Sequence, residues 1–121
     1  MNIILSPEQF ILDRIIFLDS RPNKMIDGYF TKINYSDEII TMQSLFFELA
    51  HQNINWLIDF EKRLIQYYLD NKPANNCKYH EDYKLAETLK TIQQQQSIGL
   101  VKISGIWENN IGQVGLSFRI T

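Results

Sequence analysis

The clearest pattern of hydrophobic and polar positions lies at the end of the chain, between residues 114 and 120. Four apolar side chains alternate there with small or polar ones: Val114, Leu116, Phe118 and Ile120 with Gly115, Ser117 and Arg119. A period of two predicts a strand with one buried and one solvent-facing side. With the residues before it, this strand predicts a β-hairpin over residues 100–121.

A strand is also expected near the start of the chain. Residues 9–19 are rich in β-branched and aromatic side chains, which favours a strand that ends in a turn at residues 19–23. The alternative is a helix capped at Ser6 with Pro7 in its first turn.

A second hairpin is predicted over residues 25–49. Asp27-Gly28 opens a strand at residues 29–35, and the polar turn 36–38 leads to a third strand at residues 39–49. Alternation divides the first of these strands into two sides: Tyr29, Thr31, Ile33 and Tyr35 share one side, and Phe30, Lys32 and Asn34 share the other.

Two helices are expected between the hairpins. One begins at Asn53 or Asn55 and ends near residue 70, and the other covers residues 80–96, with a loop at residues 71–78 between them. Apolar residues recur at helical spacing in both helices: Leu57, Phe60 and Leu64, then Leu85, Leu89 and Ile92. Because strands and helices fall into separate groups, we expect an α+β fold with an antiparallel sheet. The 121 residues fit a single domain, residues 1–121.

Composition adds limits on the class of protein. The chain has 45% hydrophobic and 21% charged residues, as globular proteins do, and its formal net charge of −2 is atypical of a protein that coats duplex nucleic acid. A single cysteine and charged residues among the first twenty argue against a secreted protein. No apolar run approaches a membrane span. We expect an intracellular location, in the cytoplasm or nucleus, and no membrane partner.

Few residues suggest catalysis or metal binding. Cys77 and His80 have the spacing of half a zinc site, but a structural site needs about four ligands. The same pair with Glu81 or Asp82 has the residue types of a nucleophile and its base, at positions too close in sequence for the required geometry. Phosphate-binding glycine motifs do not occur. We therefore expect neither an enzyme nor a metal or cofactor site.

Aromatic and basic residues on the predicted strands are the better candidates for function. Single-stranded nucleic acid binds where bases stack on exposed rings beside Lys and Arg side chains that contact the backbone. The candidate residues are Tyr29, Phe30, Lys32, Lys102, Trp107, Ser117 and Arg119. Each ring also has an alternative role in the core, because aromatic side chains supply much of a small domain's buried area.

Three segments resemble a poorly characterised family of small proteins from large double-stranded DNA viruses and from viral sequences integrated in eukaryotic genomes. They are residues 25–42, residues 60–68, and residues 102–108 followed by residues 115–119. The C-terminal hairpin, with its Trp-x-n-Gly-[Leu/Val/Ile]-[Ser/Thr] pattern, is also similar to the end of OB-like single-stranded DNA-binding proteins of such viruses. That likeness implies a partly open OB-like barrel as an alternative to the antiparallel sheet.

Two functions follow as expectations. The first is a non-enzymatic, single-stranded nucleic-acid-binding protein of viral type that acts in replication or recombination, with the seven candidate residues as its binding site. The second is a protein-interaction or structural module that forms a homodimer or docks on a viral partner. Lys32, Lys102 and Arg119 on one face beside exposed rings would favour the first, and an apolar, uncharged patch would favour the second.

Overall fold

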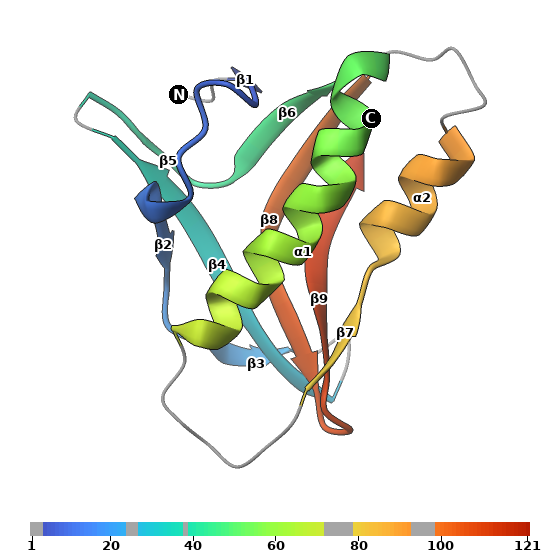
Figure 1. The fold of residues 1–121 in the computed structure, drawn as a ribbon. Helices are drawn as coiled ribbons and strands as arrows, with labels where there is room; N and C mark the ends of the chain where they lie inside the picture. The colour runs from blue at the N-terminus through green and yellow to red at the C-terminus, as the bar shows by residue number, and fades with distance from the viewer. Residues whose placement is uncertain (1–3, 24–26, 38, 72–78, 93–98) are drawn as a thin grey trace.

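The computed structural model describes residues 4–23, 27–37, 39–71, 79–92 and 99–121. In this part of the chain, two α-helices lie against one side of a nine-stranded, mostly antiparallel sheet (Figure 1). The strands are β1 (Ile4–Leu5), β2 (Ile15–Phe17), β3 (Arg21–Asn23), β4 (Gly28–Ser36), β5 (Thr41–Met42), β6 (Leu45–Leu49), β7 (His80–Asp82), β8 (Gly99–Asn109) and β9 (Gln113–Ile120). The helices are α1 (Ile54–Asp70) and α2 (Lys84–Ile92), with short 3₁₀ turns at Leu12–Arg14 and His51–Asn53. The expected α+β class with an open antiparallel sheet is confirmed, and the sheet does not close into a barrel.

Strand β8 organises the sheet. Along one edge it pairs with β9, and along its other edge it pairs first with β6 and then with β4, always antiparallel. Strands β4 and β6 therefore separate from each other where they leave β8, which makes a fork in the sheet. Two short strands pair in parallel at the margins, β1 with β6 and β7 with β9.

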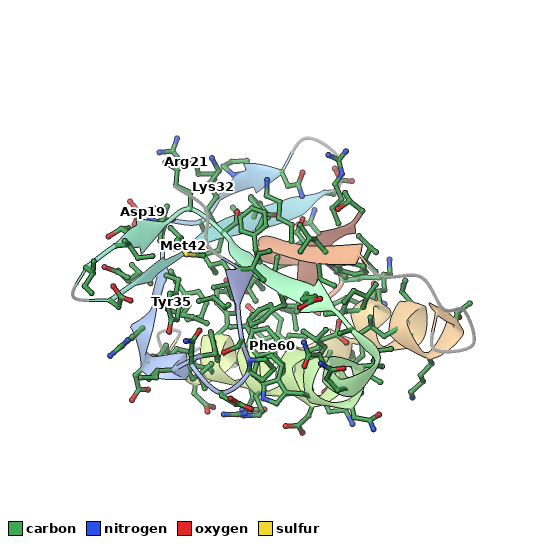
Figure 2. The ribbon with its side chains drawn as sticks, turned by 90° about the horizontal axis from the view of Figure 1, so that it is seen from above. Asp19, Arg21, Lys32, Tyr35, Met42 and Phe60 are labelled. Atoms are coloured by element: carbon green, nitrogen blue, oxygen red, sulfur yellow. The ribbon has the colours of Figure 1, made fainter. Side chains whose placement is uncertain are left out.

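The core fills the space between the sheet and the helices. From α1, Leu57, Phe60 and Leu64 are fully buried against alternate residues of the strands, among them Ile33 and Tyr35. Figure 2 shows Tyr35 and Phe60 on this helix-covered side of the sheet. The alternation predicted for β4 and β9 is thus confirmed, because Thr31, Ile33 and Tyr35 are buried, as are Val114 and Leu116.

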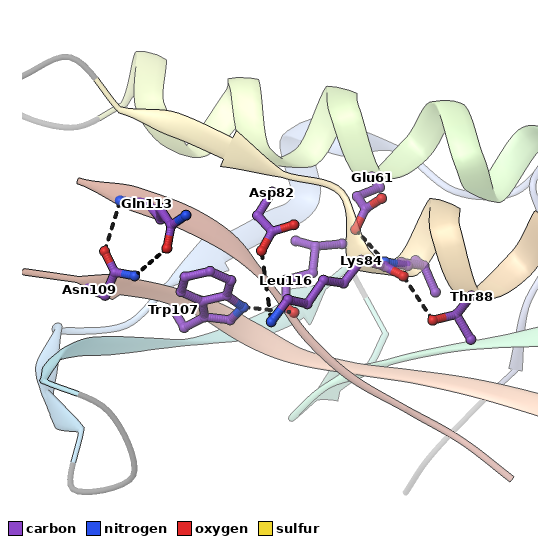
Figure 3. Close-up of polar contacts among 9 residues, drawn as sticks. Glu61, Asp82, Lys84, Thr88, Trp107, Asn109, Gln113 and Leu116 are labelled. Atoms are coloured by element: carbon purple, nitrogen blue, oxygen red, sulfur yellow. Dashed lines mark hydrogen bonds and ion pairs between the residues drawn. The ribbon is translucent and has the colours of Figure 1, made fainter. Parts of the chain in front are cut away.

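A buried carboxylate joins the two helices. Glu61 of α1, labelled in Figure 3, is fully buried. Its Oε2 and Oε1 accept hydrogen bonds from the backbone N–H groups of Leu85 and Ala86, each at 2.9 Å. These donors belong to the first turn of α2, where helical N–H groups have no partner within the helix. Burial raises the pKa of Glu61 above its usual value, and the two hydrogen bonds oppose that shift.

Several predicted boundaries are wrong. Of residues 9–19 only Ile15–Phe17 form a strand, since Phe10 packs into the core on Tyr35 and Phe60 and the chain then makes a helical turn. Residues 21–23, predicted as a turn, form β3 against β4. The third strand is interrupted at residues 43–44.

The second helix is also shorter than predicted. It begins at Lys84, because residues 80–82 pair with β9 instead. The glutamines at 93–96, the loop at 72–78 and Cys77 lie outside the described residues.

Candidate functional site

The side of the sheet opposite α1 and α2 carries most of the candidate residues, and we refer to it as the open face. Its side chains alternate with the buried residues of each strand: Phe30, Lys32 and Asn34 on β4, Phe46 and Glu48 on β6, Lys102 and Trp107 on β8, and Ser117 and Arg119 on β9. In Figure 2, Arg21 and Lys32 lie on the side of the sheet away from the helices.

The sheet register brings three predicted cations together on this face. Lys102 and Arg119 are direct partners across β8 and β9, and Lys32 on β4 pairs with Gly105. Gly105 is three positions along β8 from Lys102, a separation of about 10 Å at the usual rise of a strand. All three side chains are exposed.

A β-bulge places Lys102 and Trp107 on the same side of β8. With strict alternation, residues 102 and 107 would point to opposite faces of the sheet. The register shift between Ile103 and Gly105 adds one residue to the strand, so the residues after it change face. Before the bulge Val101 and Ile103 are buried, and after it Ile106 and Glu108 are buried. Trp107 therefore joins Lys102 on the open face.

Two aromatic rings lie across glycines of this face. A Cβ atom built on Gly105 would lie 2.7 Å from Cζ of Phe30, and one built on Gly115 would lie 2.6 Å from Cζ2 of Trp107. Each ring thus rests on a backbone that has no side chain. Both rings are half-buried, and they are register partners on adjacent strands. This arrangement makes Phe30 and Trp107 a pair of neighbouring ring surfaces.

Trp107 has further contacts that fix its orientation. Its Nε1 donates a hydrogen bond to the carbonyl oxygen of Leu116 at 3.2 Å (Figure 3). The Nζ of Lys84 lies 5.5 Å from the centre of the ring and 3.8 Å from a carboxylate oxygen of Asp82. A cation from the start of α2 therefore reaches this end of the open face.

Two hollows deepen the open face beside Phe30 and Lys32. One, of about 640 Å³, extends towards Leu18, Asp19 and Arg21. The other, of about 300 Å³, lies at the fork between β4 and β6, and we name it the fork hollow. Its walls include Phe30, Lys32, Asn34, Gln43, Ser44 and Lys102. Leu18, Phe30 and Lys32 line both hollows.

The charge of the open face is positive, unlike that of the whole chain. Arg21, Lys32, Lys102 and Arg119 are exposed, and among the residues that the structure describes none forms an ion pair with them. Apart from the ion pair of Lys84 with Asp82, the carboxylates on this side in the described residues are Asp19 and Glu48, so these four cations outnumber them by four to two. Lys102 and Arg119 face each other directly, a like-charge arrangement that costs stability.

Six of the seven predicted residues lie on the open face, and Tyr29 does not. Tyr29 is 51% exposed but points with Thr31 to the other side of β4, opposite Glu108. Ser117 lies beside the bulge, where its carbonyl oxygen and hydroxyl accept hydrogen bonds from Ser104.

The sequence prediction missed four residues of this face. Arg21 stood in an expected turn and Lys84 in an expected helix, and only the pairing of β3 and β7 shows where they lie. Phe46 lies in an apolar segment of the sequence and was not considered as a surface residue. Asn34 was assigned to the correct side of its strand but was not included among the candidate site residues.

A rival site lies on the other side of the molecule, between α1 and Tyr83. It is a groove of about 450 Å³ whose charged residues are Lys62, Arg63, Asp70 and Glu81. Lys62 lies over the ring of Tyr83, and the hydroxyl of Tyr83 donates to Glu81. Because its two cations and two carboxylates balance, this groove offers less to an anionic strand than the open face does.

A buried polar cluster beneath β4 has a structural role. Tyr68 of α1 donates a hydrogen bond to Glu108 at 3.0 Å, and its hydroxyl lies 3.2 Å from Oγ1 of Thr31, which in turn lies 2.5 Å from Oγ of Ser20. These contacts fix α1 to the centre of the sheet.

Other classes of site find no support in the described part of the chain. It contains no group of three metal-ligating side chains, and Cys77 of the predicted half-site lies outside it. Neither described helix is long and apolar enough to cross a membrane.

In the comparisons with known proteins, no family model, no curated protein and no solved structure matched this chain. The functional argument therefore depends on the chemistry of the open face.

Proposed function

We propose that this protein binds single-stranded nucleic acid on its open face, without catalysis, in the replication or recombination of a viral genome. One observation carries the proposal: Lys32, Lys102 and Arg119 lie on a single side of the sheet with Phe30 and Trp107. The viral setting rests on the resemblance of three segments: residues 25–42, residues 60–68, and residues 102–108 followed by residues 115–119.

The two rings supply surfaces for bases. A base that stacks on an exposed aromatic ring contributes about 1–3 kcal/mol to binding, largely independent of its identity. Phe30 and Trp107 lie on neighbouring strands, so two successive bases fit side by side on them. Sheets that recognise single-stranded RNA use paired rings on adjacent strands in this way.

The cations supply contacts for phosphates. Four exposed Lys and Arg side chains surround the rings without an ion-pair partner in the described residues, and Lys102 lies over the ring of Phe46. Each phosphate contact releases condensed counterions, which makes binding salt-dependent. The acidic character of the whole chain does not oppose this, because the carboxylates are concentrated away from the face.

Fluorescence anisotropy with labelled oligonucleotides tests the proposal. We expect single strands of about 12 nucleotides, within the usual site size, to bind at low salt and to dissociate as salt rises. A duplex of the same length should bind more weakly, because its bases cannot reach the rings. Absence of binding to single strands at low salt would refute the proposal.

Protein interaction is the second candidate function, and one observation favours it. The outer edge of β2 has no neighbour in the described sheet, and Ile16 and Leu18 beside it are 46% and 40% exposed. Exposed edges with apolar side chains are suited to strand pairing between two copies. Sedimentation analysis of the free protein distinguishes the candidates: a stable dimer that is lost in Ile16→Lys would favour this second function.

A further inference from the structure

The fork hollow contains polar side chains that the fold itself does not use. Among the described residues, none hydrogen-bonds the side chains of Asn34, Gln43 or Ser44. Ser44 is only 5% exposed, and polar groups buried to this extent nearly always have a partner. No fully enclosed side-chain nitrogen or oxygen in the described residues lacks one, so the Ser44 hydroxyl, which lines the fork hollow, must be open to it.

The surroundings of these groups restrict what can occupy the hollow. The ring of Phe30 forms one wall, and Lys32 and Lys102 line it without an ion-pair partner in the described residues. A volume of about 300 Å³ is at the small end of ligand sites and suits a single ring system. The fitting ligand is therefore planar, has several hydrogen-bonding groups along its edge and carries a nearby anion.

We infer that the fork hollow binds one nucleobase of the strand and reads its identity. The amides of Asn34 and Gln43 hydrogen-bond the edge of the base, assisted by Ser44, while the adjoining phosphates contact Lys32 and Lys102. A side-chain amide presents a donor and an acceptor together, which matches adenine in a bidentate pair. This inference rests on the proposed function and adds a base preference to it.

Homopolymers of adenine, cytosine and thymine test the inference by anisotropy at one low salt concentration. We expect adenine strands to bind about tenfold more tightly than the others, the discrimination of one bidentate pair. The double variant Asn34→Ala/Gln43→Ala should lose this preference while its salt dependence stays unchanged. The matched control Gln52→Ala/Asn55→Ala also removes one glutamine and one asparagine, at exposed positions near α1. This control should keep the adenine preference.

A second variant covers the case in which the double variant does not fold. Gln43 is exposed and lies between β5 and β6, so Gln43→Ala alone changes no strand and should still reduce the preference. Competition with free deoxyadenosine monophosphate shows whether the ligand is a strand or a single nucleotide. When the mononucleotide is added at the same concentration as the nucleotides of the oligonucleotide, it should not displace the oligonucleotide.

Four results would overturn the inference. Equal binding of all three homopolymers, or an adenine preference that survives in Asn34→Ala/Gln43→Ala, would remove the base-reading role and leave strand binding intact. Displacement by the free mononucleotide would assign the hollow to a small nucleotide. Failure of every oligonucleotide to bind would refute this inference together with the proposed function.

Discussion

Removing the positive charge of the open face is the perturbation whose outcome follows most directly from the structure. The triple variant Lys32→Gln/Lys102→Gln/Arg119→Gln replaces three exposed side chains that have no ion-pair partner in the described residues. Because these side chains contribute little to the core, the variant should fold normally.

The expected magnitude comes from the number of cations on the face. With four phosphate contacts, at Arg21 and the three substituted residues, the logarithm of the binding constant should fall with the logarithm of salt concentration with a slope of about −2.8. With only Arg21 left, the slope should be about −0.7. Between about 50 and 200 mM salt, the native protein should lose about 50-fold in affinity and the variant about threefold.

The assay is anisotropy of a labelled single strand across a salt series, with circular dichroism to check folding. The matched control Lys62→Gln/Arg63→Gln/Lys90→Gln removes three exposed cations from the helices, two of them from the rival groove. We expect it to retain a slope near that of the native protein. If the control lowers the slope as much as the open-face variant does, net charge governs binding and the site is wrongly placed.

Four other predictions concern stability, its pH dependence and the position of the Trp107 ring. Arg119→Glu places a carboxylate opposite Lys102, so it should raise the free energy of unfolding by about 0.2–1 kcal/mol, measured by thermal denaturation. The same variant should bind a single strand more weakly. Lower stability would contradict the pairing of residues 102 and 119. Glu61→Ala leaves two buried N–H groups without acceptors and should cost at least about 2 kcal/mol in urea denaturation, whereas a negligible change would contradict the cap. The raised pKa of Glu61 means that the stability linked to its bound proton is complete below about pH 4.5 and is lost as pH rises through the raised value, and Glu61→Gln should flatten this part of the pH profile. Gly115→Ala should displace the Trp107 ring, seen as a changed near-ultraviolet dichroism signal and weaker binding; an unchanged spectrum would contradict their contact.

The sides of the strands could be predicted from the sequence because burial enforces a period of two. Phe30 and Lys32 were assigned together, and Val114 and Leu116 were assigned to the core, from alternation alone. The apolar residues Leu57, Phe60 and Leu64 at helical spacing likewise predicted the helix α1. These features depend only on neighbours along the chain.

The assembly of the open face could not be predicted in this way. Which strands become neighbours depends on pairings between distant segments, and the bulge that brings Trp107 to the side of Lys102 breaks the alternation by one residue. The fork hollow arises where β4 and β6 leave β8, so no local sequence pattern predicts that Gln43 and Ser44 line a hollow. The N-terminal strand was predicted too long because aromatic residues such as Phe10 suit a packed core as well as a strand.

Ultraviolet crosslinking to a single-stranded oligonucleotide at low salt, followed by mass spectrometry of the peptides, tests the central claim most directly. The proposed function predicts crosslinks at Phe30 and Trp107, and their loss in the triple charge variant. Crosslinks confined to Tyr67 and Tyr83 of the rival groove would contradict it.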